Sequence, residues 1–294
     1  MSKTSPPEPF TVIVPCYNEE DGIAATVEEI TSHLGDQLDY ELLVINDGSK
    51  DHTGEVLSSL QARFPRLQVV EHPVNRGYGA AIKSGIRRAA NEYIVITDAD
   101  GSYPNDRIAE LVARCRDYDM VVGARIGTDV TYSRLRAIPK YFMKHWVSWL
   151  ARQRVPDINS GLRVFRRSVA ERFLGVLSDQ FSFTITITLS MLTNNRDVLF
   201  VPIDYYPRIG RSKIRPVRDT LRFMSLILRT GTYFAPVRAF APIFGVLFSL
   251  ALASLTYDVF ILGNITDKTA LFFLFSINIA MFALLADMID KRLG

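Results

Sequence analysis

Short runs of β-branched and other apolar residues recur along the first part of the chain, at 10–15, 41–46, 67–71, 92–97 and 119–124. The segments between them, such as 19–34 and 77–90, have the composition of helices. Strands that alternate with helices in this way predict an α/β fold, with a mostly parallel sheet covered by helices.

The last part of the chain has a different pattern. Residues 239–257 and 269–286 are two runs without a charged residue, and each approaches the roughly 20 apolar residues that span a bilayer. We therefore predict a two-helix transmembrane hairpin with a connecting loop at 258–268. Two buried helices of a soluble domain are the less favoured alternative, because paired uncharged runs of this length are uncommon in soluble cores.

Basic residues predict the orientation of this hairpin, since they concentrate on the cytoplasmic side of membrane helices. The connecting loop contributes only Lys268, and the first nine residues are polar and proline-rich, unlike a signal peptide. Both termini and the domain before the hairpin are therefore expected in the cytoplasm. The basic residues that flank the two runs are Arg211, Lys213, Arg215, Arg218, Arg222, Arg229, Arg238, Lys291 and Arg292.

Three parts are expected along the chain: a catalytic domain at 1–215, an amphipathic interface helix at 216–235 and the transmembrane hairpin at 236–294. Residues 217–234 place arginines on one helical face and apolar residues on another, as a helix lying on a membrane would. Residues 131–154 mix lysines with Phe142, Trp146 and Trp149, which suits a lipid headgroup region. Packing against the domain or against another subunit is an almost equal alternative for this second segment.

Charge and cysteine content narrow the function. A net charge of +3 is too small to indicate a nucleic-acid-binding protein. Cys16 and Cys115 form neither a spaced metal motif nor a disulfide framework. The chemistry must therefore be sought in the polar residues that follow the strands.

Polar side chains follow four of the predicted strands, in PCYNE (15–19), NDGS (46–49), TDADGS (97–102) and GAR (123–125). Ligands of open parallel sheets bind beyond the carboxyl ends of the strands, so we expect these segments to form one site. Asp98 and Asp100 flank a single residue, and two carboxylates at such a turn can approach one hard cation, for which Mg²⁺ or Mn²⁺ is the best candidate. Asp47 can accept hydrogen bonds from a ribose or a base.

Two other sites with such aspartates can be tested on the sequence. An EF-hand loop beginning at Asp98 needs a glutamate at its twelfth position, but Ala109 stands there. A haloacid-type phosphatase would use the first aspartate as a nucleophile, but here the motif follows a fourth strand and no convincing acidic pair lies downstream. A lone DxD is weak support for any function, because Asp-Gly after a strand is often only a turn.

The ordered set of motifs is more specific than any one of them. PCYNEE, VINDGSKDHT, NRGYGAAIKSG, TDADGSYP, GAR, DINSGLRVFRR and RIGRSKI follow one another between residues 15 and 214. In this order they resemble the family 2 glycosyltransferases, specifically the polyprenyl-phosphate glycosyltransferases similar to dolichyl-phosphate mannose synthase. The C-terminal pair of apolar runs also resembles the bacterial-type branch of that group.

The resemblance implies a GT-A fold that binds a nucleotide-diphosphate sugar. Residues that match the nucleotide-sugar motifs are Pro15, Tyr17, Glu19, Ile45, Asp47, Asp98, Ala99, Asp100 and Arg125. Asp98, Asp100 and Ser102 would hold Mg²⁺ or Mn²⁺. Ser102 stands where mannose synthases commonly carry glutamine, and since a hydroxyl is a weaker ligand than an amide carbonyl, we expect water to fill part of the shell.

The acceptor in this family is a polyprenyl phosphate, and its phosphate needs positive charge rather than a strong base, because its second pKa is about 6. Arg163, Arg208 and Lys213 are the candidates for that phosphate, together with Arg125. Asp157 could act as a base, orient an arginine or cap its loop. The candidate catalytic residues are Asp100, Arg125, Asp157, Arg208 and Lys213.

We therefore expect a membrane-anchored, metal-dependent, inverting glycosyltransferase that forms a homo-oligomer and binds no nucleic acid. A processive polysaccharide synthase is one alternative, but it would carry a QxxRW-type motif, which this sequence lacks. A membrane-tethered nucleotide-sugar sensor without turnover is the other. The sequence does not identify the base, the sugar or the prenyl chain length.

Overall fold

The computed structural model describes residues 8–126, 145–207, 229, 231–233 and 235–293. Its centre is a seven-stranded sheet of order β3-β2-β1-β4-β6-β5-β7. The five predicted strands are present within about one residue of their predicted ends. They are β1 (Phe10–Cys16), β2 (Tyr40–Asn46), β3 (Leu67–Glu71), β4 (Tyr93–Ile96) and β5 (Met120–Arg125).

Two strands were not predicted, β6 (Arg163–Arg166) and β7 (Val198–Ile203). β7 pairs with β5 in parallel, whereas β6 lies between β4 and β5 and pairs antiparallel with both. Every other pairing in the sheet is parallel, so the predicted mostly parallel sheet is confirmed.

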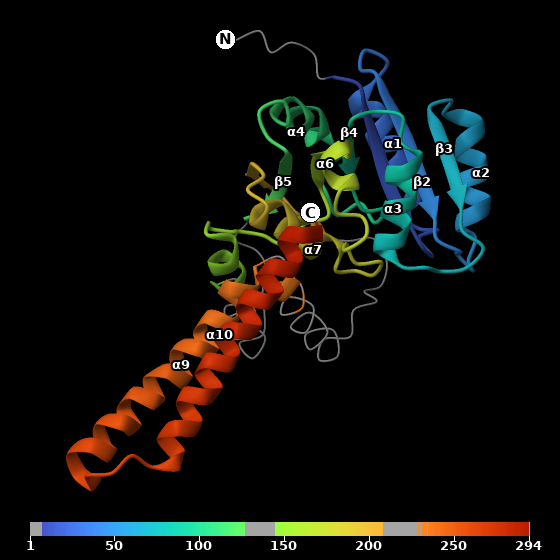
Figure 1. Ribbon diagram of the computed structural model, residues 1–294. Coiled ribbons are helices and arrows are strands. Elements are labelled where there is room, and N and C mark those ends of the chain that lie inside the picture. The colour runs from blue at the N-terminus through green and yellow to red at the C-terminus, as the bar shows by residue number, and fades with distance from the viewer. Residues whose placement is uncertain (1–7, 127–144, 208–228, 230, 234, 294) are drawn as a thin grey trace.

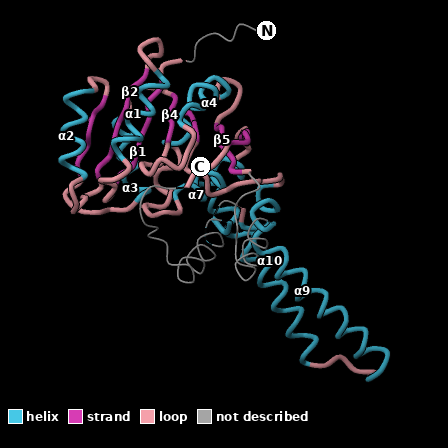
Figure 2. The backbone as a smooth tube through the Cα atoms, turned by 180° about the vertical axis from the view of Figure 1, so that it is seen from behind, coloured by secondary structure: helices cyan, strands magenta, loops and turns pink. Residues whose placement is uncertain are grey.

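Helices cover both faces of the sheet, as Figures 1 and 2 show from opposite sides. One face packs against α1 (Ile23–Leu34), α2 (Thr53–Arg63) and α4 (Ile108–Arg114), which follows the 3₁₀ turn Asn105–Arg107. The other face packs against α3 (Tyr78–Arg88), α6 (Arg167–Glu171) and α7 (Phe183–Thr193). Alternate residues of each strand thus enter separate apolar clusters, which gives the sheet a buried core on both sides.

Helix α3 lies especially close to the sheet. A Cβ atom on Gly85 would stand 2.6 Å from Cγ2 of Ile13 in β1, so only glycine permits this approach. Gly77, the residue just before the first residue of α3, has φ of 107°, a conformation that L side chains rarely adopt. These two glycines set the position of the α3 N-terminus relative to the strand ends.

The strand order reverses direction at β1, which has β2 on one side and β4 on the other. The loops after β1 and β4 therefore diverge at the carboxyl edge of the sheet, and this is the place where open α/β sheets bind ligands. All four motif segments end at this edge, because β4 and β5 each run antiparallel to β6 and so share the direction of β1 and β2.

The C-terminal apolar runs form a helical hairpin that extends away from the sheet domain, with its turn at the far end (Figure 1). It consists of α9 (Pro236–Tyr257), a π-helical turn (Asp258–Leu262) and α10 (Asp267–Leu293). Both helices are long and apolar enough to cross a membrane. Many of their large apolar side chains are exposed, as the lipid-facing side of a membrane hairpin would be.

The hairpin joins the domain through the helical segment 145–151. Leu150 is buried against Ala235 and Ala239 at the start of α9, and the guanidinium of Arg238 donates a hydrogen bond to the Leu150 carbonyl. The predicted boundary at 215–216 and most of the predicted interface helix lie outside the described residues.

Candidate active site

The loops after β1 and β2 are bonded together at the carboxyl edge. The Asn18 backbone N–H donates to Ser49 Oγ at 2.9 Å, and the Lys50 N–H donates to Asn18 Oδ1 at 2.8 Å. Within the sheet, Pro15 lies opposite Ile45, and both are buried. Tyr17 and Glu19, which follow β1, are half-buried. The structure therefore brings together four of the residues expected to bind the nucleotide sugar.

Asp47, expected at the nucleoside, is buried and organises the next loop. Its Oδ1 accepts the N–H of Arg76 at 2.9 Å, its Oδ2 accepts the N–H of Gly77 at 2.8 Å, and His72 Nδ1 lies 2.7 Å from Oδ1. The other nitrogen of His72 is 2.9 Å from Ser84 Oγ in α3. Asp47 thus ties the end of β2 to the N-terminus of α3. The sequence interpretation missed His72, for which no motif spacing gave a signal.

The DAD motif begins where β4 ends. Asp100 is buried, and its Oδ1 accepts hydrogen bonds from the hydroxyl of Ser102 at 2.5 Å and from the Ser102 N–H at 3.1 Å. The carbonyl of the intervening Ala99 accepts the hydroxyl of Thr26 at 3.0 Å. The turn after Asp100 needs Gly101, which has φ of 68°. Asp100 and Ser102 are therefore close enough to present oxygens to the same cation.

Asp98 is held from two sides. The hydroxyl of Tyr78 in α3 donates to its Oδ1 at 2.9 Å. A Cβ atom on Gly161 would stand 2.8 Å from each carboxylate oxygen, so the glycine backbone directly faces Asp98. Burial, reinforced by the charge of Asp98, raises the pKa of Tyr78 well above its ordinary value, and the phenol stays a donor at neutral pH.

The oxygens of this motif fit a hard divalent cation. Two carboxylates and one hydroxyl supply only part of a six-coordinate shell, and Mg²⁺ commonly completes such a shell with water and substrate phosphates. Among the described residues, no group of three or more His, Cys, Asp and Glu side chains is arranged to hold a metal. We conclude that any cation here would depend on substrate oxygens as well as on protein.

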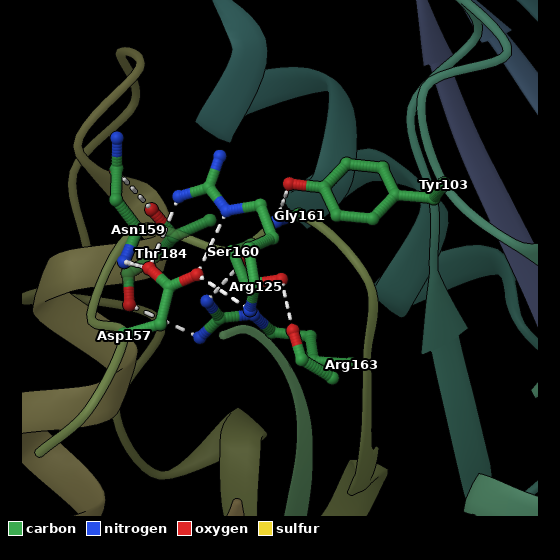
Figure 3. A network of polar contacts seen from close by, with 9 residues as sticks. Tyr103, Arg125, Asp157, Asn159, Ser160, Gly161, Arg163 and Thr184 are labelled. Carbon is green, nitrogen blue, oxygen red and sulfur yellow. Dashed lines mark hydrogen bonds and ion pairs between the residues drawn. The ribbon is translucent and has the colours of Figure 1, made fainter. Parts of the chain in front are cut away.

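The DINSG loop closes the other side of the site (Figure 3). The Gly161 N–H donates to the hydroxyl of Tyr103 at 2.6 Å, which bonds this loop to the end of the TDADGSY stretch. The ring of Tyr103 meets the ring of Tyr205 edge-on at 5.3 Å, and the guanidinium of Arg125 lies 5.1 Å from the Tyr205 centroid. Tyr103 thus connects the Asp98 loop, through Tyr205, to Arg125 at the end of β5.

Arg125 and Asp157 form a two-point ion pair. Nε and Nη2 of Arg125 donate to the carboxylate at 2.7 and 3.0 Å, and the Arg125 backbone N–H donates to it at 3.1 Å. Burial alone would raise the pKa of Asp157, but its bonds to Arg125 keep that pKa below the ordinary value. A carboxylate with a lowered pKa is a poor proton acceptor, so of the roles expected for Asp157 the geometry favours orienting Arg125.

Arg163 lies in the interior rather than at the surface. It has no exposed area, and its guanidinium donates to the Ser160 and Thr184 carbonyls (Figure 3). The guanidinium also donates to the Thr188 hydroxyl. Burial lowers its pKa to about 10. The expected contact with an acceptor phosphate is not supported by this position, since every side of the guanidinium faces protein. Arg208 and Lys213, the other two acceptor candidates, lie outside the described residues.

A model of the family described as glycosyl transferase family 2 matches residues 11–174 of this chain, more than half of its length. The chain belongs to this family. A second model, described as the GtrB C-terminal hairpin, matches residues 235–291. This glycosyltransferase therefore combines a family 2 catalytic domain with the type of hairpin predicted from its sequence.

Individual relatives agree with the family assignment. The family 2 chain is 27% identical over 248 residues to dolichyl-phosphate beta-glucosyltransferase ALG5C of Trichomonas vaginalis, covering 78% of this chain and 73% of that protein. It is 30% identical over 220 residues to polyprenol monophosphomannose synthase of Mycolicibacterium smegmatis, covering 71% and 82% of the two chains.

A solved structure is similar in fold. It is glucosyl-3-phosphoglycerate synthase from Mycobacterium tuberculosis, in complex with Mn²⁺, UDP and glucosyl-3-phosphoglycerate. The TM-score is 0.55 at 19% identity, and the match covers 75% of this chain and 79% of that one. At this identity the likeness concerns the fold alone, and it confirms the predicted GT-A architecture.

Proposed function

We propose that this glycosyltransferase moves a single sugar from a nucleotide-diphosphate sugar to a polyprenyl phosphate on the cytoplasmic face of a membrane, with a divalent metal and with inversion at the anomeric carbon. One observation carries the proposal. A strand edge with two carboxylates and an arginine–aspartate pair is joined, through the segment 145–157, to a hairpin long and apolar enough to cross a membrane.

The donor half of the proposal rests on the loops after β1, β2 and β4. Tyr17, Glu19 and Asp47 would contact the nucleoside, and Asp98 and Asp100 would face the diphosphate. The crystal structure of glucosyl-3-phosphoglycerate synthase in complex with Mn²⁺ and UDP supports a metal and a nucleotide diphosphate as ligands of this fold. When bound by Asp98, Asp100 and Ser102, such a cation supplies positive charge that stabilises the leaving diphosphate.

The acceptor half rests on cations and on the membrane hairpin. The two relatives above carry names that specify dolichyl phosphate and polyprenol as acceptors. Arg125 is fixed by Asp157 and Tyr205, so the guanidinium N–H groups that do not bond to Asp157 have a defined direction for a phosphate. We propose that Arg208 and Lys213, which follow Tyr205 closely in the sequence, complete the phosphate site.

The proposed reaction needs no protein base. A prenyl phosphate is largely ionised at neutral pH, and its oxygen can attack the anomeric carbon directly while the nucleotide diphosphate leaves from the opposite face. One such displacement inverts the configuration. The lowered pKa of Asp157 is consistent with this proposal, because the residue then serves to hold Arg125 rather than to remove a proton.

The proposed topology places the domain and both termini in the cytoplasm, where nucleotide sugars are made. The arginines before α9 support this orientation. The turn at 258–268 would then face the opposite side of the membrane.

The direct test is a product assay on the purified, detergent-solubilised enzyme. It would be incubated with a panel of nucleotide sugars, a polyprenyl phosphate and Mn²⁺ or Mg²⁺, and the lipid product identified by mass. The expected product carries a single hexose on the lipid phosphate. If the donor sugar is α-linked to its nucleotide, the bond between the hexose and the lipid phosphate should have the β configuration. Polymer formation, or tight nucleotide-sugar binding with no lipid product from any donor, would contradict the proposal.

A further inference from the structure

An exposed aromatic residue beside the DAD motif has no role in the proposal above. Phe181 precedes α7 and leaves 45% of its surface exposed. Its ring lies 5.6 Å from the ring of Tyr78, at an angle of 47°. Tyr78 is the residue whose hydroxyl bonds to Asp98. Tyr78 therefore contacts both the exposed ring of Phe181 and the carboxylate of Asp98, which is proposed to bind the donor.

The loop that carries Phe181 is firmly attached to α3. Lys83 is buried, and its ammonium donates to the Leu177 carbonyl at 2.6 Å and to Asp179 Oδ1 at 2.7 Å. The Ala80 N–H donates to the Asp179 carbonyl at 2.9 Å, and the Gln180 amide donates to the Arg76 carbonyl at 3.4 Å. Burying a lysine costs free energy unless its charge is compensated. The hydrogen bonds of Lys83 to Leu177 and Asp179 therefore hold the loop in a fixed position against α3.

Two glycines allow the loop to approach. A Cβ on Gly77 would stand 2.5 Å from the Asp179 carbonyl oxygen, and a Cβ on Gly79 would overlap the Ser178 carbonyl oxygen. The first turn of α3 therefore lies directly against residues 178–180. Because the same turn carries Tyr78, the positions of Phe181, Tyr78 and Asp98 are fixed relative to one another.

We propose that Phe181 is a sugar-contacting residue, whose ring packs against the C–H face of the donor sugar. A hexose has hydroxyl groups at its rim and a less polar C–H face, so it can meet a carboxylate on one side and an aromatic ring on another. Phe181 would offer the aromatic surface, and Asp98 would accept a sugar hydroxyl in addition to facing the cation and the diphosphate. Tyr78 contacts both residues. An isoprene unit has no hydroxyl for the Asp98 side, and for this reason we assign the ring to the sugar. The inference rests on the proposed function.

The test compares binding of a nucleotide sugar with binding of the nucleotide alone. The probes are the nucleotide sugar that the wild-type enzyme turns over and the corresponding nucleoside diphosphate, both titrated calorimetrically with Mn²⁺ and without acceptor. Phe181→Leu keeps an apolar side chain but removes the ring. It should reduce the preference for the nucleotide sugar by about three- to tenfold, the size of one aromatic contact, and leave nucleoside diphosphate affinity unchanged. Phe181→Tyr keeps an aromatic ring and should retain the wild-type preference for the nucleotide sugar over the nucleoside diphosphate.

Phe64→Leu is the matched control, since it makes the same change just before β3 at the opposite edge of the sheet. An unchanged preference in Phe181→Leu would overturn the inference, as would an equal loss of affinity for both probes, which would indicate a structural role for the loop. A higher KM for polyprenyl phosphate with normal donor binding would also overturn it, because the ring would then contact the lipid. If the wild-type enzyme binds no nucleotide sugar at all, the proposed function itself fails, and this inference fails with it.

Discussion

Replacing Asp157 with asparagine tests whether this residue works by orienting Arg125. The carboxylate accepts three hydrogen bonds from Arg125, two from the guanidinium and one from the backbone. Asparagine keeps the shape but has one oxygen and no charge, and its amide N–H group would face a guanidinium donor. At least one of the three bonds must be lost, and the ion pair disappears.

The size of the effect follows from the burial of the pair. The side chains of Arg125 and Asp157 are 24% and 11% exposed, so the 3–5 kcal/mol lost on breaking a fully buried pair is an upper limit, and hydrogen bonds to charged groups contribute about 1.5–3 kcal/mol. We expect Asp157→Asn to lower the free energy of unfolding by about 2 kcal/mol. For a domain of this size that corresponds to about 4–8 °C in Tm.

The same reasoning gives a pH dependence. The pKa of Asp157 is lower in the folded protein than its ordinary value of about 3.9. The stabilisation is therefore complete above that ordinary value and is lost as the pH falls through the folded-state pKa. The difference in Tm between wild type and variant should be largest near neutral pH and should shrink below about pH 4.

Thermal unfolding followed by circular dichroism in detergent measures both quantities, and the exposed Asp117→Asn serves as the control. The stability losses of Arg125→Gln and Asp157→Asn should also fail to add in the double variant, because both remove the same pair. Equal Tm values at pH 7, or a difference that grows as the pH falls, would refute the orienting role. Strictly additive losses would refute it as well.

Two further variants test the site, and a pair of cysteine variants tests the topology. Asp100→Asn should abolish lipid-product formation without lowering Tm, and near-normal turnover with Mg²⁺ or Mn²⁺ would remove Asp100 from the metal site. Gly161→Ala should reduce transfer at least tenfold, since its Cβ would stand 2.8 Å from both oxygens of Asp98; wild-type kcat/KM in that variant would show that the position of Asp98 is unimportant. A cysteine placed in the 258–268 loop should react with an impermeant maleimide added outside intact cells, whereas one near the N-terminus should not, and the reverse pattern would overturn the proposed topology.

The first half of the sheet could be predicted because its strands are continuous apolar runs. Parallel strands buried on both faces need apolar residues at nearly every position, and β1, β2 and β4 meet that need except at Thr11, Glu41 and Asn46. The polar residues that follow these strands, including Asp47 and Asp98, must therefore lie at the carboxyl edge of the sheet. Local sequence was sufficient here because each motif stands directly after its strand.

The second half depends on contacts that no local pattern shows. β6 is four residues long with an arginine at each end. Arg163 can be buried only because the carbonyls of Ser160 and Thr184 accept hydrogen bonds from its guanidinium. Helix α7 is buried on all sides and shows no amphipathic stripe. Its hydroxyl residues, such as Thr188, bond to carbonyls one turn back. The sequence interpretation had expected Arg163 at the acceptor phosphate and made no prediction for α7.

The active site and the membrane hairpin are linked through a short, well-packed stretch of chain. Leu150 packs against the start of α9, and seven residues later Asp157 holds Arg125. Val147, Ala151 and Val155, on either side of Leu150 in the chain, are buried against α7, and the Val155 N–H donates to the Ser148 hydroxyl at 3.1 Å. The position of Arg125 is therefore set relative to the hairpin rather than to the sheet alone. Under the proposed function, with an acceptor phosphate that stays at the membrane surface, this linkage would place the reacting oxygen at a constant height above the bilayer, and the donor sugar would need only to be held at the strand edge to meet it.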